Sequence, residues 1–141
     1  MSKPTRAYAL LIAVGFLTAG VLGVFTNNDF GTGADVTRDA VLGLLDTNGW
    51  HNLFHFAFVP LAVWVANRAG GARSFALFAG VLYGVIGMSG IVIGDDAVLL
   101  GLIPVNLIDS AIHLSLGALG LAASWYATTL RRPQARYAAG S

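Results

Sequence analysis

The sequence predicts an all-α integral membrane protein, built as a four-transmembrane-helix bundle, and three observations lead to this prediction. Of the 141 residues, 56% are hydrophobic and only 11% are charged, a balance that does not fit the surface of a water-soluble domain of this size. Four apolar runs are each close to the roughly 20 residues that cross the hydrocarbon core of a bilayer. The basic residues also gather on one side of a four-span arrangement. We therefore expect residues 1–141 to form a single membrane domain whose spans are residues 8–25, 50–67, 74–93 and 105–127.

The first span, residues 8–25, follows Lys3 and Arg6 but is not followed by a small-residue cleavage pattern. We therefore expect a retained helix rather than a signal peptide. In the four-span arrangement one side holds seven of the eight basic residues, namely Lys3, Arg6, Arg68, Arg73, Arg131, Arg132 and Arg136. The positive-inside rule then predicts a multi-pass protein of the cell membrane with both termini in the cytoplasm.

The longest connection, residues 26–47, follows the first span on the outer side. Its second half places apolar residues at helical spacing: Val36, Ala40, Val41, Leu44 and Leu45. This spacing predicts a short amphipathic helix that lies on the outer membrane surface or caps the bundle.

The third span, residues 74–93, carries a row of small residues that includes Gly80, Gly84, Gly87 and Gly90. Small residues at such spacing let helices approach closely inside a bilayer. We expect this helix to pack against a neighbour in the bundle, and a free glycine-lined face to support a homo-oligomer or a contact with another membrane protein. The lipid bilayer is the main partner. Nucleic acid is not expected, because topology already explains the basic residues.

Polar residues of the second span recur in the fourth span 58 positions later. The pairs are Asn48 and Asn106, His51 and Asp109, Asn52 and Ser110, and His55 and His113. Both helical hairpins start on the inner side, so the pattern predicts two parallel-related hairpins about an axis along the membrane normal.

In each of these spans the polar residues fall on one helix face, because they follow the i, i+3, i+4 spacing. Polar side chains are costly against lipid, so both stripes should point into the bundle, towards each other. At a rise of 1.5 Å per residue, His55 and His113 lie at similar depth in the outer half of the bundle. The sequence therefore predicts a buried cluster of His, Asp and Asn side chains.

A metal site is one interpretation of this cluster. The ligands would be His51, His55, Asp109 and His113, and the supporting polar residues would be Asn48, Asn52, Asn106 and Ser110. Imidazole and carboxylate ligands suit zinc, copper or iron, and the chain has no cysteine to add a thiolate. A variant is haem with His55 and His113 as axial ligands.

Two other interpretations stay open. The cluster can be a structural hydrogen-bonded network that fixes helix register, or part of a proton or solute path, although both polar faces turn apolar below His55 and His113. No activated nucleophile or phosphate-binding loop is present, which favours a non-catalytic membrane protein with a structural or ligand-binding cluster over an enzyme. The alternative is a haem- or metal-dependent redox or transport protein.

The fourth span also carries a resemblance to a known family. Its segment N-L-I-D-S-A-I-H-L-S-L-G, residues 106–117, together with N-L-F-H, residues 52–55, resembles the bacterial four-helix membrane proteins catalogued as domain of unknown function 4383. The chain departs from that pattern at Ser110, where an Asn is expected, and at Val59 and Pro60, where a small residue is expected. The resemblance covers nearly the whole chain. It implies four helices and a membrane location, and it implies no activity.

Overall fold

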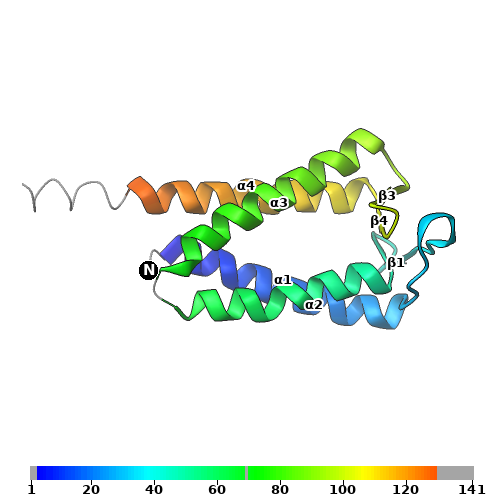
Figure 1. The fold of residues 1–141 in the computed structure, drawn as a ribbon, viewed down its shortest axis with the longest axis horizontal. Helices are drawn as coiled ribbons and strands as arrows, with labels where there is room; N and C mark the ends of the chain where they lie inside the picture. Colours follow the sequence, from blue (N-terminus) through cyan, green and yellow to red (C-terminus); the bar gives the residue numbers. More distant parts are fainter. Residues whose placement is uncertain (1–2, 69, 130–141) are drawn as a thin grey trace, which may run out of the picture.

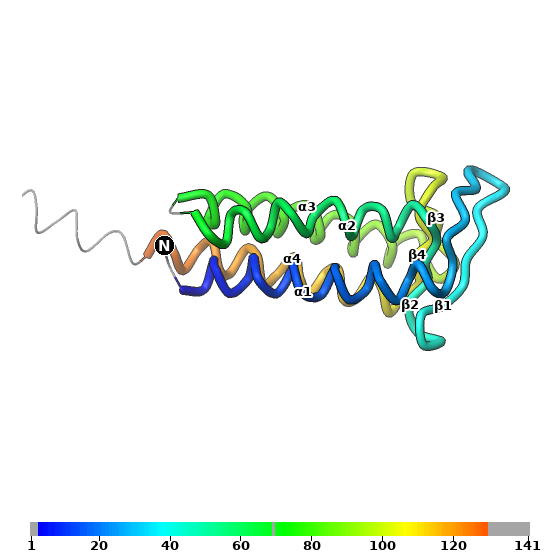
Figure 2. The backbone as a smooth tube through the Cα atoms, turned by 90° about the horizontal axis from the view of Figure 1, so that it is seen from below, coloured from blue at the N-terminus to red at the C-terminus, as the bar shows by residue number. Residues whose placement is uncertain are grey.

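The computed structural model describes residues 3–68 and 70–129 and contains four long helices that are capped at one end by two small β-hairpins (Figures 1 and 2). The helices are α1 (Lys3–Thr26), α2 (Gly49–Ala66), α3 (Gly71–Ile93) and α4 (Leu107–Thr129). Each predicted span falls on one of them, with boundaries shifted by a few residues. Arg131, Arg132 and Arg136, which the topology prediction used, lie outside the described residues.

Three of these helices, α1, α3 and α4, are long and apolar enough to cross a membrane by length and composition. Along them, large apolar side chains such as Val14, Val85 and Trp125 are exposed, as expected where lipid rather than water surrounds a protein. Helix α2, which carries His51 and His55, is not among the three. The chain is therefore a helical protein with three candidate membrane spans, and the fourth span stays a prediction.

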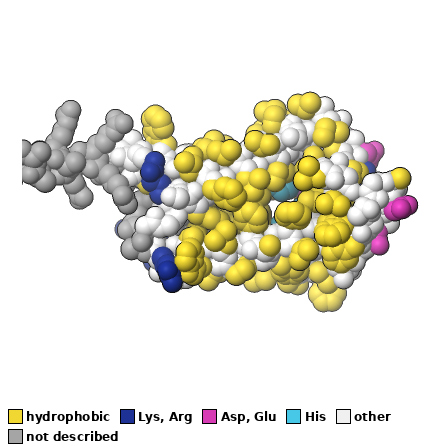
Figure 3. Space-filling view, in the orientation of Figure 1, with side chains coloured by type: hydrophobic (Ala, Val, Ile, Leu, Met, Phe, Trp, Pro, Cys, Tyr) yellow, Lys and Arg dark blue, Asp and Glu magenta, His cyan; other side chains and the backbone are white. Residues whose placement is uncertain are grey.

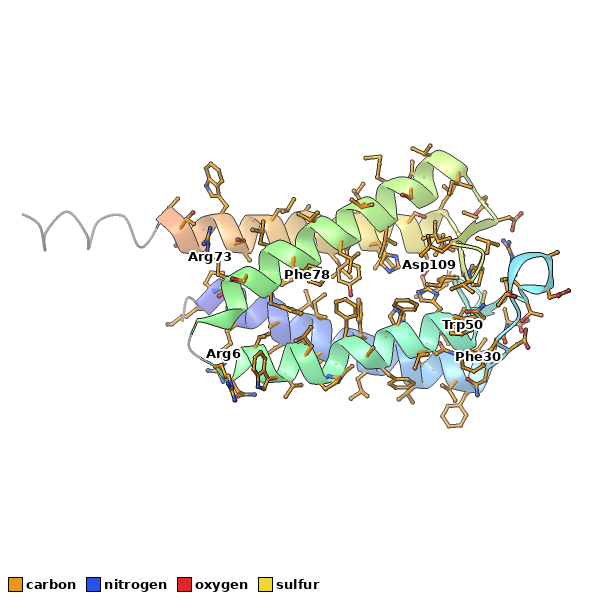
Figure 4. All side chains as sticks on the ribbon, viewed as in Figure 1. Arg6, Phe30, Trp50, Arg73, Phe78 and Asp109 are labelled. Carbon is orange, nitrogen blue, oxygen red and sulfur yellow. The ribbon has the colours of Figure 1, made fainter. Side chains whose placement is uncertain are left out.

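The charged residues separate to the two ends of the bundle. Figure 3 shows Lys and Arg side chains at the end near the N-terminus, Asp side chains at the hairpin end, and apolar side chains between them. Figure 4 places Arg6 and Arg73 at the first end, and Phe30, Trp50 and Asp109 at the second.

The loop before α2 forms a β-hairpin, and the predicted amphipathic helix is wrong. A single 3-10 turn, η1 (Gly33–Asp35), precedes the strand β1 (Asp39–Val41), which pairs antiparallel with β2 (Leu45–Thr47). The chain reverses at Leu42 and Gly43, whose φ angles are +54° and +71°. Apolar residues three or four apart in so short a segment also suit a hairpin, and here Val41 becomes the buried residue of β1.

The loop before α4 repeats this hairpin, so the all-α prediction also needs correction: the helical bundle carries two small two-stranded sheets. Strand β3 (Ala97–Leu99) pairs antiparallel with β4 (Ile103–Val105), and the chain turns at Leu100 and Gly101, whose φ angles are +55° and +67°. Each hairpin leads directly into an even-numbered helix (Figure 1).

Contacts between the two loops hold the hairpin end together. The Arg38 guanidinium pairs with the Asp96 carboxylate at 2.6 Å and also donates to the Asp96 carbonyl at 2.7 Å. The Gly33 amide donates to the carbonyl of Gly101 in the turn of the second hairpin, at 2.8 Å. The loop of one half of the chain is therefore anchored on the loop of the other half.

Within the bundle, α1 packs along α2, and α3 packs along α4 (Figures 1 and 2). The α3–α4 contact depends on glycine. A Cβ atom on Gly87 would lie 2.5 Å from the backbone nitrogen of Leu114, and one on Gly117 would lie 2.6 Å from the backbone nitrogen of Gly84. Oligomer formation through another face of α3 stays a prediction.

Two glycines of α3 provide a matched test of this packing. We expect Gly87→Ala to destabilise the protein by about 1–3 kcal/mol, because its methyl group would overlap the α4 backbone. Gly84→Ala, whose Cβ meets nothing within 4 Å, should be neutral or stabilising by up to about 1 kcal/mol, because alanine favours a helix over glycine. Thermal unfolding in detergent, followed by circular dichroism, checks both variants. Equal effects of the two substitutions would contradict the proposed role of Gly87.

Candidate functional site

Asparagine side chains fix the first turns of the two helices that carry the polar residues. The Asn48 side chain caps α2 by accepting a hydrogen bond from the His51 amide at 3.0 Å. At the equivalent place in α4, Asn106 accepts from the Asp109 amide at 2.9 Å. Asparagine is among the preferred N-cap residues, because its short side chain reaches the free amides of the first turn. The caps therefore set where the side chains of each first turn point.

The same two asparagines connect the halves of the chain to each other. Asn48 donates its side-chain amide to the carbonyl of Leu102, at the turn of the second hairpin, at 2.8 Å. Asn106 donates to the carbonyl of Leu44, at the turn of the first hairpin, also at 2.8 Å. The two bonds are equivalent and reciprocal, so each helix start is anchored on the hairpin of the other half.

Asn52 and Ser110 are also buried and hydrogen-bonded. Asn52 donates to the Asn27 carbonyl at 2.8 Å and accepts from the Thr47 hydroxyl at 2.7 Å. Ser110 donates to the Asn106 carbonyl at 2.8 Å. The structure thus gives all four of the polar residues that the sequence predicted as support, Asn48, Asn52, Asn106 and Ser110, a partner within the protein.

The three histidines meet beneath this polar layer. One ring nitrogen from each of His51, His55 and His113 lies within 4.8 Å of the others. Two of the rings are oriented by backbone carbonyls: His51 Nδ1 lies 2.9 Å from the Asp46 oxygen, and His113 Nδ1 lies 2.8 Å from the Asp109 oxygen. A carbonyl can only accept, so in these neutral rings Nδ1 carries the proton and Nε2 keeps its lone pair.

His55 differs from the other two histidines. Its Nδ1 atom is buried and has no hydrogen-bond partner among the described residues. Its ring packs against the rings of His51 and Phe16, with 4.6 Å between centroids in both cases. One buried ring nitrogen of the cluster therefore has no partner in the described part of the chain.

Asp109, the fourth predicted metal ligand, is not part of this group. Its carboxylate is buried, and Oδ2 accepts a hydrogen bond from the Asp46 amide at 2.8 Å. The structure therefore brings together three of the four predicted ligands, the histidines. The Asp109 carboxylate instead accepts a hydrogen bond from the backbone of strand β2.

The histidines line two of the cavities that the described residues form. The larger has a volume of about 450 Å³, lies between α2 and α3, and is lined by all three histidines and mostly apolar residues. Figure 3 shows histidine atoms at the bottom of a hollow on the face in view. The smaller, of about 350 Å³, is lined by parts of α1 and the first hairpin and by Asp46, His51, His55 and Asp109. His51 and His55 line both cavities.

The arrangement does not suit haem between His55 and His113. A porphyrin held by two axial histidines needs a flat space across the line that joins them. The ligand nitrogen of His51 lies within 4.8 Å of the ligand nitrogens of both residues, so its imidazole occupies part of that space.

Sequence reasoning missed several groups at this site. Asp46 contributes its backbone to both His51 and Asp109. The ring of Tyr83 stacks on His113 with 5.7 Å between centroids, and its hydroxyl is buried and has no hydrogen-bond partner among residues 3–68 and 70–129. A signal for the hairpins was present in the sequence: Leu-Gly-Leu at 42–44 recurs at 100–102, in the same 58-residue register as the polar pairs.

The cap residue Asn48 allows a direct test of the polar layer. We expect Asn48→Ala to lower the stability of the metal-free protein by about 2 kcal/mol, because it removes an N-cap and leaves the Leu102 carbonyl without its partner. Asn67→Ala is the matched control, since Asn67 is exposed at the other end of α2 and bonds only within its own helix. Its effect should stay within about 0.5 kcal/mol. Thermal unfolding checks both, and equal losses would contradict the role of Asn48.

Comparison with known proteins gives a family but no activity. The family model described as Domain of unknown function (DUF4383) matches residues 6–126. No curated protein and no solved structure matched the chain. The matched region covers α1 to most of α4, including the hairpins and the histidine cluster, and the chain belongs to the DUF4383 family.

Proposed function

We propose that this chain is a small integral membrane protein that binds one transition metal ion, zinc, copper or iron, through His51, His55 and His113. The observation that carries the proposal is the convergence of three ring nitrogens within 4.8 Å. Nitrogen ligands at 2.0–2.1 Å from a tetrahedral zinc ion lie about 3.3 Å from one another. A bound ion would therefore require the nitrogens to approach by about 1.5 Å at most.

The surroundings of the rings support a metal. Metal-binding histidines usually donate their other ring N–H to a carbonyl or carboxylate, which fixes the ring orientation and strengthens the ligand. His51 and His113 have this arrangement with the carbonyls of Asp46 and Asp109. A buried ring nitrogen without a hydrogen-bond partner destabilises a protein by roughly 1–3 kcal/mol. Binding of the ion to Nδ1 of His55, which has no partner among the described residues, would remove this penalty.

A purely structural network explains less of the site. Asn48, Asn52, Asn106 and Ser110 have hydrogen-bond partners that do not involve the imidazole rings. The polar layer is therefore satisfied without the three histidines, and their convergence needs another explanation. A haem group is disfavoured by the position of His51.

The smaller cavity provides an access route for the cation. Its lining includes Asp46 and Asp109, and it extends to His51 and His55. A metal site needs such a route as well as ligands. In this proposal Asp109 attracts the cation and orients His113 through its own backbone carbonyl, and the three imidazoles hold the ion.

The proposal includes the membrane arrangement. The four helices form four spans of the cell membrane, with both termini in the cytoplasm and the two hairpins outside. Support comes from the basic residues at one end and the acidic residues at the other (Figure 3), which agrees with the positive-inside rule. Two parallel-related halves are supported by the hairpins and asparagine caps, which recur 58 residues apart.

Metal content tests the site. Protein purified in mild detergent from cells supplied with zinc, copper and iron should carry about one ion per chain, and His113→Ala should lose it. Tyr83→Phe is the matched control, because Tyr83 stacks on His113 and the substitution removes only the hydroxyl group. It should keep the ion. Elemental analysis and an absorption spectrum of the same samples check both variants.

Stability gives a second measurement of the same site. A chelator should lower the unfolding temperature of the wild type and leave that of His113→Ala unchanged, since an ion present at 100 times its dissociation constant stabilises by about 2.7 kcal/mol. A stable wild type that takes up no metal, or an equal metal content in His113→Ala, would overturn the proposal. A Soret band would point to haem instead.

Single cysteines test the orientation, since the chain has no cysteine of its own. Leu42→Cys places a thiol at the exposed turn of the first hairpin, and Arg73→Cys places one on an exposed position near the start of α3. We expect a membrane-impermeant maleimide to label Leu42→Cys in intact cells and Arg73→Cys only after lysis. The reverse pattern would require the opposite orientation.

A further inference from the structure

We infer that the cavity between α2 and α3 binds a membrane-dissolved, ring-bearing molecule with a neutral oxygen head group, of the quinol class, with an oxygen facing the three histidines. This inference deepens the proposed function and rests on it, because the oxygen of the head group would occupy the open coordination position of the metal ion. Three protein ligands on a metal commonly leave one position for water or another molecule.

The cavity opens on the side of the bundle that faces lipid. Helices α2 and α3 diverge towards the hairpin end (Figure 1). The rim of the cavity includes Phe54, Val85 and Ile93, which are exposed apolar side chains. Leu99, Leu100 and Ile103 of the second hairpin line the cavity at its outer end. In the proposed membrane arrangement, an apolar molecule dissolved in the bilayer reaches the histidines sideways, between two helices.

The lining selects a flat, apolar body. Four aromatic side chains contribute to it, namely Phe16, Phe54, Phe58 and Tyr83, beside aliphatic residues of α3 and the second hairpin. Aromatic rings gain by stacking on, or packing edge to face against, another ring. A volume of about 450 Å³ lies within the range of small-molecule sites, about 300–1,000 Å³. Both the volume and the lining fit a substituted six-membered ring with the start of an apolar tail.

The polar groups select the head group. Among the described residues, no Lys, Arg, Asp or Glu lines this cavity, so a head group there would meet the proposed ion and uncharged polar side chains. The aromatic lining, rather than charge, favours a ring over the acyl chain of a fatty acid. The polar lining consists of the three histidines, Ser89 and Tyr83. A neutral hydroxyl both donates and accepts, so it can bind the ion or an uncharged polar side chain of this lining without a further charge.

The direct test titrates zinc-loaded protein in nanodiscs with decylubiquinol under anaerobic conditions, using calorimetry and subtracting empty nanodiscs. Zinc is chosen because it has no redox chemistry. We expect about one quinol per chain. Ile86→Trp, which fills the cavity from α3, should weaken binding at least about tenfold, or 1.4 kcal/mol, with the zinc content unchanged. Met88→Trp is the matched control, since Met88 is exposed and does not line the cavity, and it should bind as the wild type does.

Ser89→Phe serves as a second cavity-filling variant if Ile86→Trp does not fold. Zinc-loaded wild type that binds no quinol, or that binds oleate as tightly as the quinol, would overturn this inference and leave the metal site intact. Equal binding by the filled variants and Met88→Trp would also overturn it. A wild type that takes up no zinc would overturn the proposed function and this inference with it.

Discussion

The structure depends on two reciprocal hydrogen bonds, from Asn48 to the Leu102 carbonyl and from Asn106 to the Leu44 carbonyl. Near hydrocarbon, backbone and side-chain polar groups must find partners inside the protein, because lipid offers none. Each asparagine also caps its own helix. These two functions of one side chain fix where α2 and α4 begin relative to both hairpins, and therefore the depth at which their histidines meet.

The helices could be predicted from the sequence, whereas the hairpins could not. Long apolar runs indicate membrane helices because their length matches the bilayer, and α1, α3 and α4 agree with that criterion. A three-residue strand has no comparable signature. The turns moreover place Leu42 and Leu100 at positive φ, a conformation that is unusual for leucine and that no residue preference predicts. The one indication of the hairpins in the sequence is that Leu-Gly-Leu at 42–44 recurs 58 residues later.

The candidate site, like the fold, could be predicted from the sequence only in part. His51, His55 and His113 were grouped from helical spacing and from the 58-residue repeat, both of which can be read directly from the sequence. The partner of Asp109 is the amide of Asp46, which belongs to a strand that the sequence had assigned to a helix, so the position of the carboxylate could not be predicted. Tyr83 was missed because an aromatic residue in an apolar span is typical of a packed core.

The recurrence of the β-hairpins has a consequence for the composition of the histidine site. In a symmetric dimer of separate half-length chains, every residue would occur twice, so the positions of His51 and Asp109 would hold either two histidines or two aspartates. In a single chain, the two similar helix starts can differ at these positions. Both keep an asparagine cap, while α2 supplies two imidazoles and α4 supplies one imidazole and a carboxylate. Three histidines can therefore meet at one site, a number that a symmetric dimer of identical chains cannot supply.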